Sequence, residues 1–433
     1  MHPPLARTFF RLHEALLGRK TFRILAELTR SQYWPPEKLR ALQLRRLRGL
    51  VAAAYEHTPY WREVMDSRGF GPDDIRSLDD VRRFPLLHRQ TIRDRREEMV
   101  WRGEGPRVLL ARTSGSTNAA LEFYTSSRRE AHITAARMRG HAWVGCPPGA
   151  KEVYFWAAPV ELGAQDRIKA LRDRLRNDLF TSALLITPEV VPRYVEQWRR
   201  WGVNCLFGYV SSFVMLARIA RQTGVDLAVL RDAGLRCIVT TSELLGENRQ
   251  VIAEAFGMPV YDSYGVREGG LIGHECEHQT LHTNDEMLLL EVLDRDTLEP
   301  TDGEGELAVT MLASHCMPVI RYRTGDVVTR VDRPCPCGRT LPALRVSGGR
   351  VLEFIVTRSG KWVSAIAFIY VCRKIRGVTQ LQARQERRGQ VRVLVAVDEQ
   401  FPPDGLRQVE QATRQRLEDD DEIAVEIVDE IPP

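Results

Sequence analysis

Hydroxyl residues gather in a short loop after a predicted strand, Val108 to Ala111. Backbone N–H groups and hydroxyls in such a loop are able to wrap a polyphosphate. Taken alone, a cluster of Ser, Thr and Gly is more often a surface turn, and this one lacks the lysine of a Walker loop. The residues that would contact phosphate are Thr113, Ser114, Gly115, Ser116 and Thr117.

A second segment with chemical potential, YDSYGVREGG, spans Tyr261 to Gly270 and includes a predicted strand end. The ring of Tyr264, followed by Gly265, is suited to stacking on a purine. The carboxylate of Glu268 is suited to binding the Mg²⁺ that accompanies ATP phosphates. The alternative is a Tyr-Gly turn with a solvated glutamate.

A third segment, RYRTGDVV, spans Arg321 to Val328. Asp326 follows a glycine turn there, and its carboxylate is able to accept hydrogen bonds from both hydroxyls of a ribose. In isolation, a Thr-Gly-Asp sequence is more often a simple Asx-type turn.

An α/β rhythm between these segments predicts the elements that position them. An apolar helix face of Val191, Val195 and Trp198 is stopped by Gly202. Strands and helices then alternate, which implies a parallel sheet that binds ligands at the carboxyl ends of its strands. The strands are expected at 203–207, 236–240 and 259–262, and the helices at 211–223 and 246–256.

The sequences before and after this α/β region predict two further parts of the chain. Residues 1–105 read as a helical prelude packed on a nucleotide- and acyl-binding core at 106–350, with one helix beginning at Ser77. The amphipathic stretch 5–28 favours a packed helix over an interfacial membrane helix. Residues 351–433 read as a small α+β lid domain. The fold class is therefore α/β, with mostly parallel sheets in a large domain and a small C-terminal domain.

Composition excludes several classes of protein. The 433 residues are 43% hydrophobic and 27% charged, which is ordinary for a folded globular chain. A net charge of +5, spread over many helices, does not favour nucleic-acid binding. Eight cysteines, with no secretory signal and no run of 18 apolar residues, indicate the cytoplasm and argue against disulfides and transmembrane segments.

Taken together, the three segments resemble the adenylate-forming ligase superfamily over about residues 105–355. GELAVT at 305–310 and GGRVLEFI at 348–355 add to the resemblance. GYVSS at 208–212, TTSELL at 240–245 and CPCGRTLP at 335–342 resemble the phenylacetate–CoA ligase and CapK-like, capsule-polysaccharide branch.

The resemblance implies an enzyme that uses ATP and Mg²⁺ to activate a carboxylic acid as an acyl-adenylate. The acyl group then passes to coenzyme A or another acceptor. By motif, Thr113 to Thr117 would hold the phosphates, Ser242 and Glu243 would border the adenine, and Tyr264 would stack on it. Glu268 would bind Mg²⁺, and Asp326 with Arg350 would fix the ribose. Thr117, Glu268 and Arg350 would be the catalytic residues.

The resemblance also implies a hinge at Glu353, where the family usually has an aspartate and the longer carboxylate keeps the charge. Two departures from the family pattern weigh against full activity. Asn118 and Ala120 stand where the family has Gly and Pro. The sequence as given ends at Pro432 and Pro433, before the loop that carries the family's adenylation lysine. Poor adenylation is therefore expected, and the alternative is a catalytically degenerate protein that binds nucleotide or acyl-adenylate. Base rates favour a homodimer.

Paired Cys and His residues predict a structural Zn²⁺ site. Three thiols and one imidazole supply the four ligands of a Cys₃His tetrahedron. The alternative is two unrelated thiol pairs in turns, and His274 and His278 are spare candidates for the fourth ligand. The predicted ligands are Cys276, His282, Cys335 and Cys337.

Overall fold

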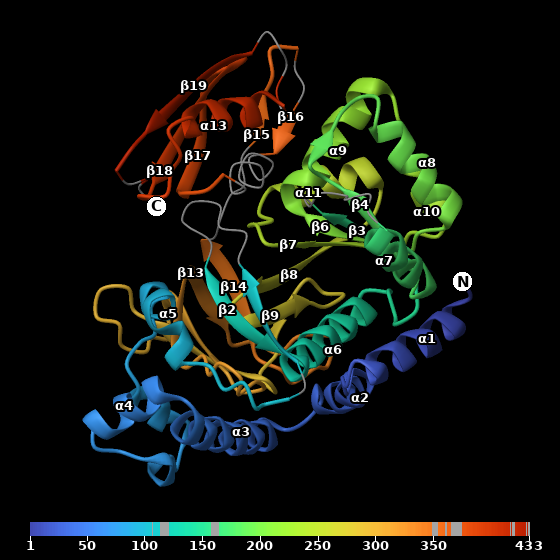
Figure 1. The fold of residues 1–433 in the computed structure, drawn as a ribbon. Helices are drawn as coiled ribbons and strands as arrows, with labels where there is room; N and C mark the ends of the chain where they lie inside the picture. Colours follow the sequence, from blue (N-terminus) through green and yellow to red (C-terminus); the bar gives the residue numbers. More distant parts are fainter. Residues whose placement is uncertain are drawn as a thin grey trace. The chain divides into compact units, whose positions relative to one another are not determined.

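A computed structural model of the chain describes residues 1–105, 107–112, 121–156, 164–348, 354–359, 362–364, 375–415, 417, 421–429 and 431. The chain divides into two compact units (Figure 1). Unit 1 consists of the described residues of 1–113, 121–150 and 261–349, and unit 2 of those of 151–260 and 350–433. The predicted domain boundaries at 105 and 350 stay predictions.

Short helices occupy the N-terminal part of unit 1. Proline occupies the first turn of three of them, where its missing N–H has no helical partner to lose. The stretch predicted as one amphipathic helix forms two. The second is packed as expected, with Leu25 and Leu28 buried. The first buries Phe10 but leaves Leu5, Leu12 and Leu16 exposed. The helices are α1 (Pro3–Leu16), α2 (Thr21–Ser31), α3 (Pro36–His57), α4 (Pro59–Ser67) and α5 (Arg89–Arg95). None of the helices in the described ranges is long and apolar enough to cross a membrane.

The helix expected from Ser77 is only a 3-10 turn, Leu78–Arg83. Its start is as predicted, because Asp80 accepts a hydrogen bond from the Ser77 N–H at 2.7 Å. Phe84 is extended, since the residue before Pro85 is disfavoured in the helical region. The proline therefore ends the helix after its first turns.

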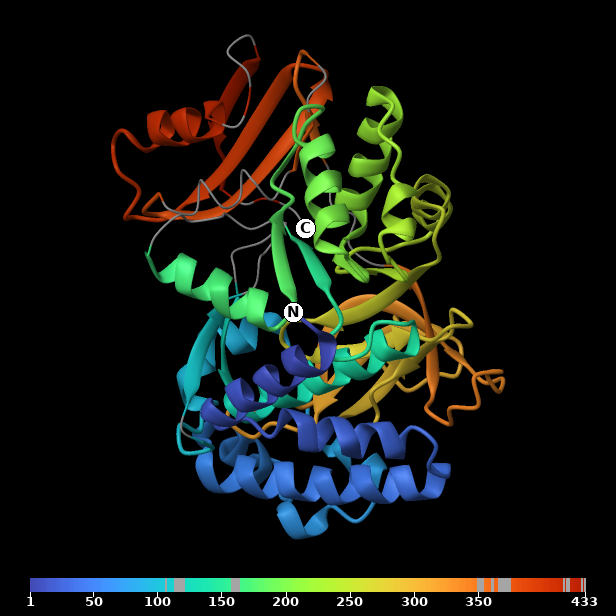
Figure 2. The same cartoon turned by 90° about the vertical axis from the view of Figure 1, so that its right-hand side faces the viewer.

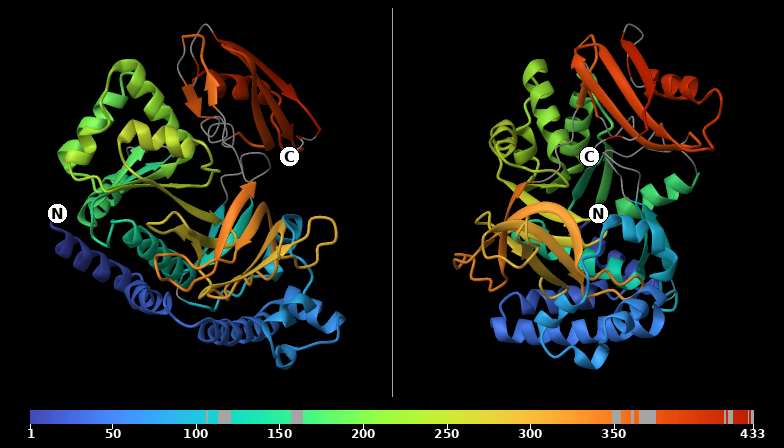
Figure 3. Two further views of the ribbon diagram at one scale, coloured as in Figure 1. Left: turned by 180° about the vertical axis from the view of Figure 1, so that it is seen from behind. Right: turned by 90° about the vertical axis from the view of Figure 1, so that its left-hand side faces the viewer.

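The strands of unit 1 form an antiparallel, curved sheet (Figure 3). Their order is β11-β12-β13-β14-β10-β9-β8. Helix α6 (Ser127–Trp143) follows the hairpin of β1 (Val108–Arg112) and β2 (Glu122–Ser126), and it packs on α2 and β9 (Figure 2). The strand bounds are β8 (Val260–Val266), β9 (Gly270–Glu275), β10 (Leu281–Thr283), β11 (Leu288–Leu293), β12 (Glu304–Met311), β13 (Tyr322–Val331) and β14 (Ala343–Gly348).

Two of the three predicted parallel strands lie in unit 2, where β6 and β7 pair in parallel. The third, predicted at 259–262, is β8, which pairs antiparallel with β9. Strands β7, β6, β3 and β4 lie in that order, and each neighbouring pair is parallel. Gly202 ends α8 in the left-handed region with φ 73°, which fits the predicted stop. The bounds are β3 (Glu152–Trp156), β4 (Asp178–Ser182), β6 (Cys205–Tyr209), β7 (Cys237–Thr241), α7 (Ala164–Leu175), α8 (Val191–Trp201), α9 (Val210–Thr223), α10 (Val229–Asp232) and α11 (Asn248–Phe256).

The C-terminal part of unit 2 has the predicted order of strand, strand, helix, strand. Strand β18 (Gln390–Val397) pairs antiparallel with β17 (Val378–Arg387) and parallel with β19 (Glu422–Ile427). Helix α13 (Gly405–Arg414) packs on β19. A second small sheet has the order β15-β16-β5 and contains β15 (Phe354–Val356), β16 (Trp362–Ser364) and β5 (Leu185–Ile186).

Candidate functional site

The turn that carries Asp326 is held by a glutamate on the neighbouring strand. Gly325 adopts φ 77°, a left-handed conformation that suits glycine, and its N–H donates to Glu306 Oε1 at 3.2 Å. Arg323 binds the same carboxylate through Nε at 3.0 Å. The hydroxyl of Thr324 donates to the Leu307 carbonyl at 2.9 Å. These contacts fix the direction of the Asp326 side chain.

Tyr264 and Asp326, predicted as parts of separate motifs, are in direct contact. The Tyr264 hydroxyl donates to Asp326 Oδ2 at 2.7 Å. Tyr264 lies on β8, beside Gly265, where a Cβ would approach the Gly270 carbonyl oxygen to 2.8 Å. Glycine is therefore required for this hairpin to close as it does. The structure brings the predicted purine-stacking ring and the predicted ribose-binding carboxylate into one cluster.

Glu268 lies at the tip of the hairpin between β8 and β9. Its side chain is only 4% exposed, so it is not the solvated glutamate of the alternative interpretation. The Tyr322 hydroxyl donates to Glu268 Oε1 at 3.3 Å, and Arg89 Nη1 lies 3.6 Å from the same atom. The buried carboxylate thus has one hydroxyl and one guanidinium as neighbours.

A buried arginine holds the backbone on which Glu268 sits. Arg129, in the first turn of α6, is 5% exposed, and its Nη2 donates to the carbonyl oxygens of Arg267 at 2.5 Å and Glu268 at 3.1 Å. Sequence reasoning missed Arg129, and it also missed Arg89, Tyr322 and Glu306. Nothing in their local sequence marks them, because each acts through a partner far along the chain.

The predicted adenine-bordering residues belong to unit 2, at the end of β7. Ser242 adopts φ 71°, an uncommon conformation for a residue with a Cβ. Glu243 accepts hydrogen bonds from the backbone N–H and the hydroxyl of Ser211, both at 2.6 Å. Ser211 belongs to the GYVSS segment at the start of α9, so this contact joins two motifs that the sequence shows separately.

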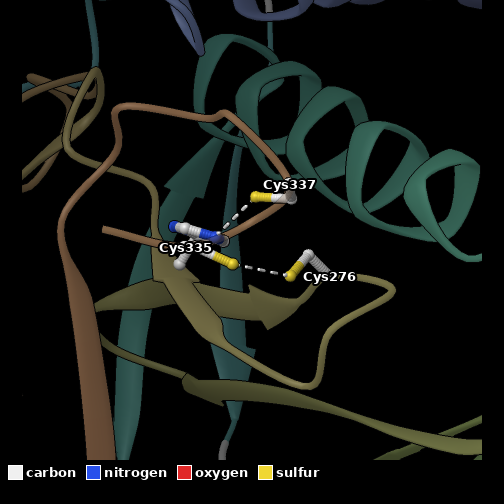
Figure 4. A group of neighbouring side chains, drawn as sticks. Cys276, Cys335 and Cys337 are labelled. Atoms are coloured by element: carbon white, nitrogen blue, oxygen red, sulfur yellow. Dashed lines mark hydrogen bonds between the residues drawn. The ribbon is translucent and has the colours of Figure 1, made fainter. Parts of the chain in front are cut away.

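The predicted zinc ligands also lie together, in unit 1. Cys276 Sγ lies 3.6 Å from Cys335 Sγ, and Cys337 Sγ lies 3.2 Å from His282 Nε2 (Figure 4). All four ligand atoms are within 4.8 Å of one another. The spare candidate His274 directs Nδ1 to the Glu275 carbonyl oxygen at 2.8 Å instead. The structure therefore groups the four residues that the sequence selected.

The chain is similar to known coenzyme A ligases. No protein-family model matches the sequence. A phenylacetate–coenzyme A ligase of Thermus thermophilus is 27% identical over 352 residues, which cover 75% of this chain and 73% of the relative. One from Escherichia coli is 26% identical over 353 residues, which cover 74% and 73%. A crystal structure of a 2-hydroxyisobutyryl-CoA ligase in complex with 2-HIB-AMP and CoA matches with a TM-score of 0.63 and 20% identity, over 92% of this chain and 88% of that one.

The chain is similar to phenylacetate–CoA ligases over about three quarters of its length. The likeness confirms the predicted fold class, an α/β chain with a large sheet and a small C-terminal sheet. Several predicted site residues lie outside the described residues, and their roles stay predictions: Thr113, Ser114, Gly115, Ser116, Thr117, Asn118, Ala120, Arg350 and Glu353.

The stability of the folded chain is expected to depend on pH through the carboxyl group of Glu243. Burial raises the pKa of Glu243 to about 7 from an ordinary value of 4.5, while the hydrogen bonds from Ser211 act in the opposite direction. Between these two values the folded chain holds a proton that the unfolded chain has released, so stability falls as the pH rises. The expected fall in the free energy of unfolding is on the order of 2 kcal/mol across this window.

Chemical denaturation at a series of pH values checks this expectation. Glu243→Gln, whose amide resembles the protonated carboxyl, removes this group's share of the pH dependence. Glu247→Gln, at an exposed position on the same loop, serves as the matched control and keeps the wild-type profile. A Glu243→Gln profile that parallels the wild type would contradict the assignment.

Proposed function

We propose that this chain is an acid–thiol ligase, which joins a carboxylic acid to coenzyme A through an acyl-adenylate. The observation that carries the proposal is the contact between Tyr264 and Asp326, because it places an aromatic ring and a carboxylate at adjoining positions. An adenosine needs both: a ring on which the purine stacks, and an acceptor for the ribose hydroxyls. The names of the relatives support the choice of acceptor.

Asp326 accepts hydrogen bonds from the ribose in this proposal, and the Tyr264 hydroxyl holds one of its oxygens. The hydrogen bond to Oδ2 fixes the plane of the Asp326 carboxylate, and carboxylate oxygens are the acceptors that ribose hydroxyls require. Glu306 holds the turn from the other side through Gly325 and Arg323. A preorganised acceptor loses little conformational entropy when the nucleotide binds.

The carboxylate of Glu268 is suited to binding the Mg²⁺ ion that accompanies ATP. Its carboxylate supplies one hard oxygen ligand, and Mg²⁺ is commonly bound by one or two carboxylates plus phosphates and water. Bound there, the ion would neutralise charge on the departing pyrophosphate. Arg129 keeps the hairpin tip in place through the carbonyls of Arg267 and Glu268, and Arg89 supplies a positive charge beside the same carboxylate.

The proposed reaction has two steps. In the first step, a carboxylate oxygen of the acid forms a bond to the α-phosphorus of ATP. The bond between this phosphorus and the oxygen that bridges to the β-phosphate breaks, and pyrophosphate leaves. The thiolate sulfur of coenzyme A then forms a bond to the acyl carbon, and AMP leaves. The proposed phosphate-binding loop is Thr113 to Thr117, and the ribose is proposed to contact Arg350 as well as Asp326. The adenine is proposed to lie against Ser242 and Glu243, and the proposed hinge is Glu353. A place in capsule-polysaccharide metabolism and a homodimeric state stay predictions from the sequence.

The test is substrate-dependent exchange of labelled pyrophosphate into ATP, run with a panel of carboxylic acids. The panel begins with phenylacetate and 2-hydroxyisobutyrate, the acids that the relatives' names suggest. Acid-dependent exchange at a low rate is the expected result, because the sequence predicts poor adenylation, and AMP release should follow when coenzyme A is added. Calorimetric titration with AMP distinguishes a ligase from a catalytically degenerate protein. AMP binding without pyrophosphate exchange would contradict the proposed activity and support a protein that only binds nucleotide.

A further inference from the structure

We propose that Cys276, His282, Cys335 and Cys337 bind one Zn²⁺ ion as a closed structural site, and that this ion clamps the 335–342 loop onto the junction of α2 and α3. Zinc bonds of about 2.3 Å to sulfur and 2.0–2.1 Å to nitrogen require tetrahedron edges of about 3.8 Å between sulfurs and about 3.6 Å between sulfur and nitrogen. The two closest pairs of ligand atoms lie at 3.6 Å and 3.2 Å. Binding therefore needs movements of only a few tenths of an ångström at these pairs.

The surrounding hydrogen bonds orient the ligands. His282 Nδ1 lies 3.0 Å from the Leu341 carbonyl oxygen, so Nδ1 carries the proton and Nε2 presents its lone pair to Cys337. The backbone N–H of His278 donates to Cys276 Sγ at 3.4 Å. The Cys335 thiol donates to the Thr280 hydroxyl oxygen at 3.3 Å, and this hydroxyl can donate to the sulfur once the thiol has lost its proton. Such donors stabilise thiolates. These hydrogen bonds to the candidate ligand atoms distinguish the group from cysteines that are close to one another by chance.

The ligand set points to a structural role. Three thiols and one imidazole complete a tetrahedron, which leaves no position for water or substrate. No ligand belongs to the residues assigned to nucleotide binding. The site therefore adds a function that the proposed ligase activity does not require, and either proposal can fail without the other.

Contacts of the loop show what the ion would hold. Thr340 donates its N–H to the Gln32 carbonyl oxygen at 2.9 Å and its hydroxyl to the Trp34 carbonyl oxygen at 2.6 Å. Trp143 Nε1 donates to Gln32 Oε1 at 2.7 Å, so α6 reaches the same junction. The loop from Cys335 to Pro342 has little regular structure of its own. Metal bonds at Cys335 and Cys337 would fix its base, only a few residues from Thr340.

The first experiment measures metal in the full chain, purified without chelator. The expected content is about one zinc per chain, and Cys337→Ala is expected to lower it by about fivefold or more. Cys237→Ala, a buried thiol in unit 2, is the matched control and should keep the wild-type content. Cobalt substitution of the wild type adds a test that no variant's folding can obscure, because tetrahedral thiolate coordination gives intense visible bands and sulfur-to-cobalt charge transfer. A wild-type chain that retains neither zinc nor such a cobalt spectrum would overturn the metal site.

The second experiment tests the clamp by hydrogen exchange with and without the metal. Removal of zinc should speed exchange at the Thr340 amide by about tenfold or more, since its bond to Gln32 depends on the loop. Amides of α9 in unit 2 should not change and serve as the internal control. Equal Thr340 protection in the metal-bound and metal-free chains would overturn the clamp.

Discussion

Asp326→Ala is expected to weaken AMP binding by about 100-fold or more, because two hydrogen bonds from the ribose to a charged acceptor disappear together. The Tyr264 hydroxyl would also lose its acceptor, which leaves a polar group without the partner it has at 2.7 Å. Isothermal titration calorimetry with AMP measures the change directly, and it needs no knowledge of the acid substrate.

Two further variants sharpen this result. Tyr264→Phe keeps the ring and removes only the hydroxyl, so its expected loss of AMP affinity is about fivefold to tenfold. Asp332→Ala, at an exposed position just after β13, should bind AMP as the wild type does. Wild-type AMP affinity in Asp326→Ala would refute the assignment of this cluster to the ribose.

Glu268→Gln is expected to lower the rate of pyrophosphate exchange by about 100-fold or more, while AMP affinity changes by no more than about threefold. The amide keeps the size of the side chain and can still accept from Tyr322, but it lacks the charge that Mg²⁺ requires. Titration of ATP with and without Mg²⁺ gives a second readout. The wild type should bind ATP more tightly with the ion, and the variant should lose most of that difference.

Glu299→Gln provides the comparison for this charge change, since Glu299 is exposed in a turn of unit 1. It should leave both exchange and the Mg²⁺ effect as in the wild type. A Glu268→Gln chain that kept the full Mg²⁺ effect on ATP binding would exclude Glu268 as the metal ligand and leave it a structural role beside Arg89 and Tyr322.

The sequence selects candidate site residues but not the residues that contact them. Tyr264, Glu268 and Asp326 stand in short motifs, so residue type and order were enough to select them. Their partners are set by packing between distant strands, and Tyr264 meets Asp326 across 62 residues. Arg129 reaches the hairpin tip from 138 residues away. Local patterns contain no information about such registers.

Secondary structure shows the same division. The strands and helices of unit 2 alternate regularly, so their order and parallel pairing were predictable. In unit 1 the sheet is antiparallel, and its strands follow one another without helices from β8 to β14. The prediction of an α-helix from Ser77 was wrong because Pro85 follows the N-cap too closely for a full helix to form. The grouping of Cys276, His282, Cys335 and Cys337 was predictable because short, paired spacings of this kind are typical of metal sites.

Two tyrosines, Tyr264 and Tyr322, connect the hairpin of β8 and β9 to β13 in opposite directions. Tyr264 of the hairpin binds Asp326 of β13, and Tyr322 of β13 binds Glu268 of the hairpin. A displacement of either segment must therefore disturb both carboxylates at once. If one carboxylate serves the ribose and the other the cation, occupancy of each site changes the free energy of binding at the other. Thermodynamic reciprocity then requires AMP to raise Mg²⁺ affinity by the same factor by which Mg²⁺ raises AMP affinity.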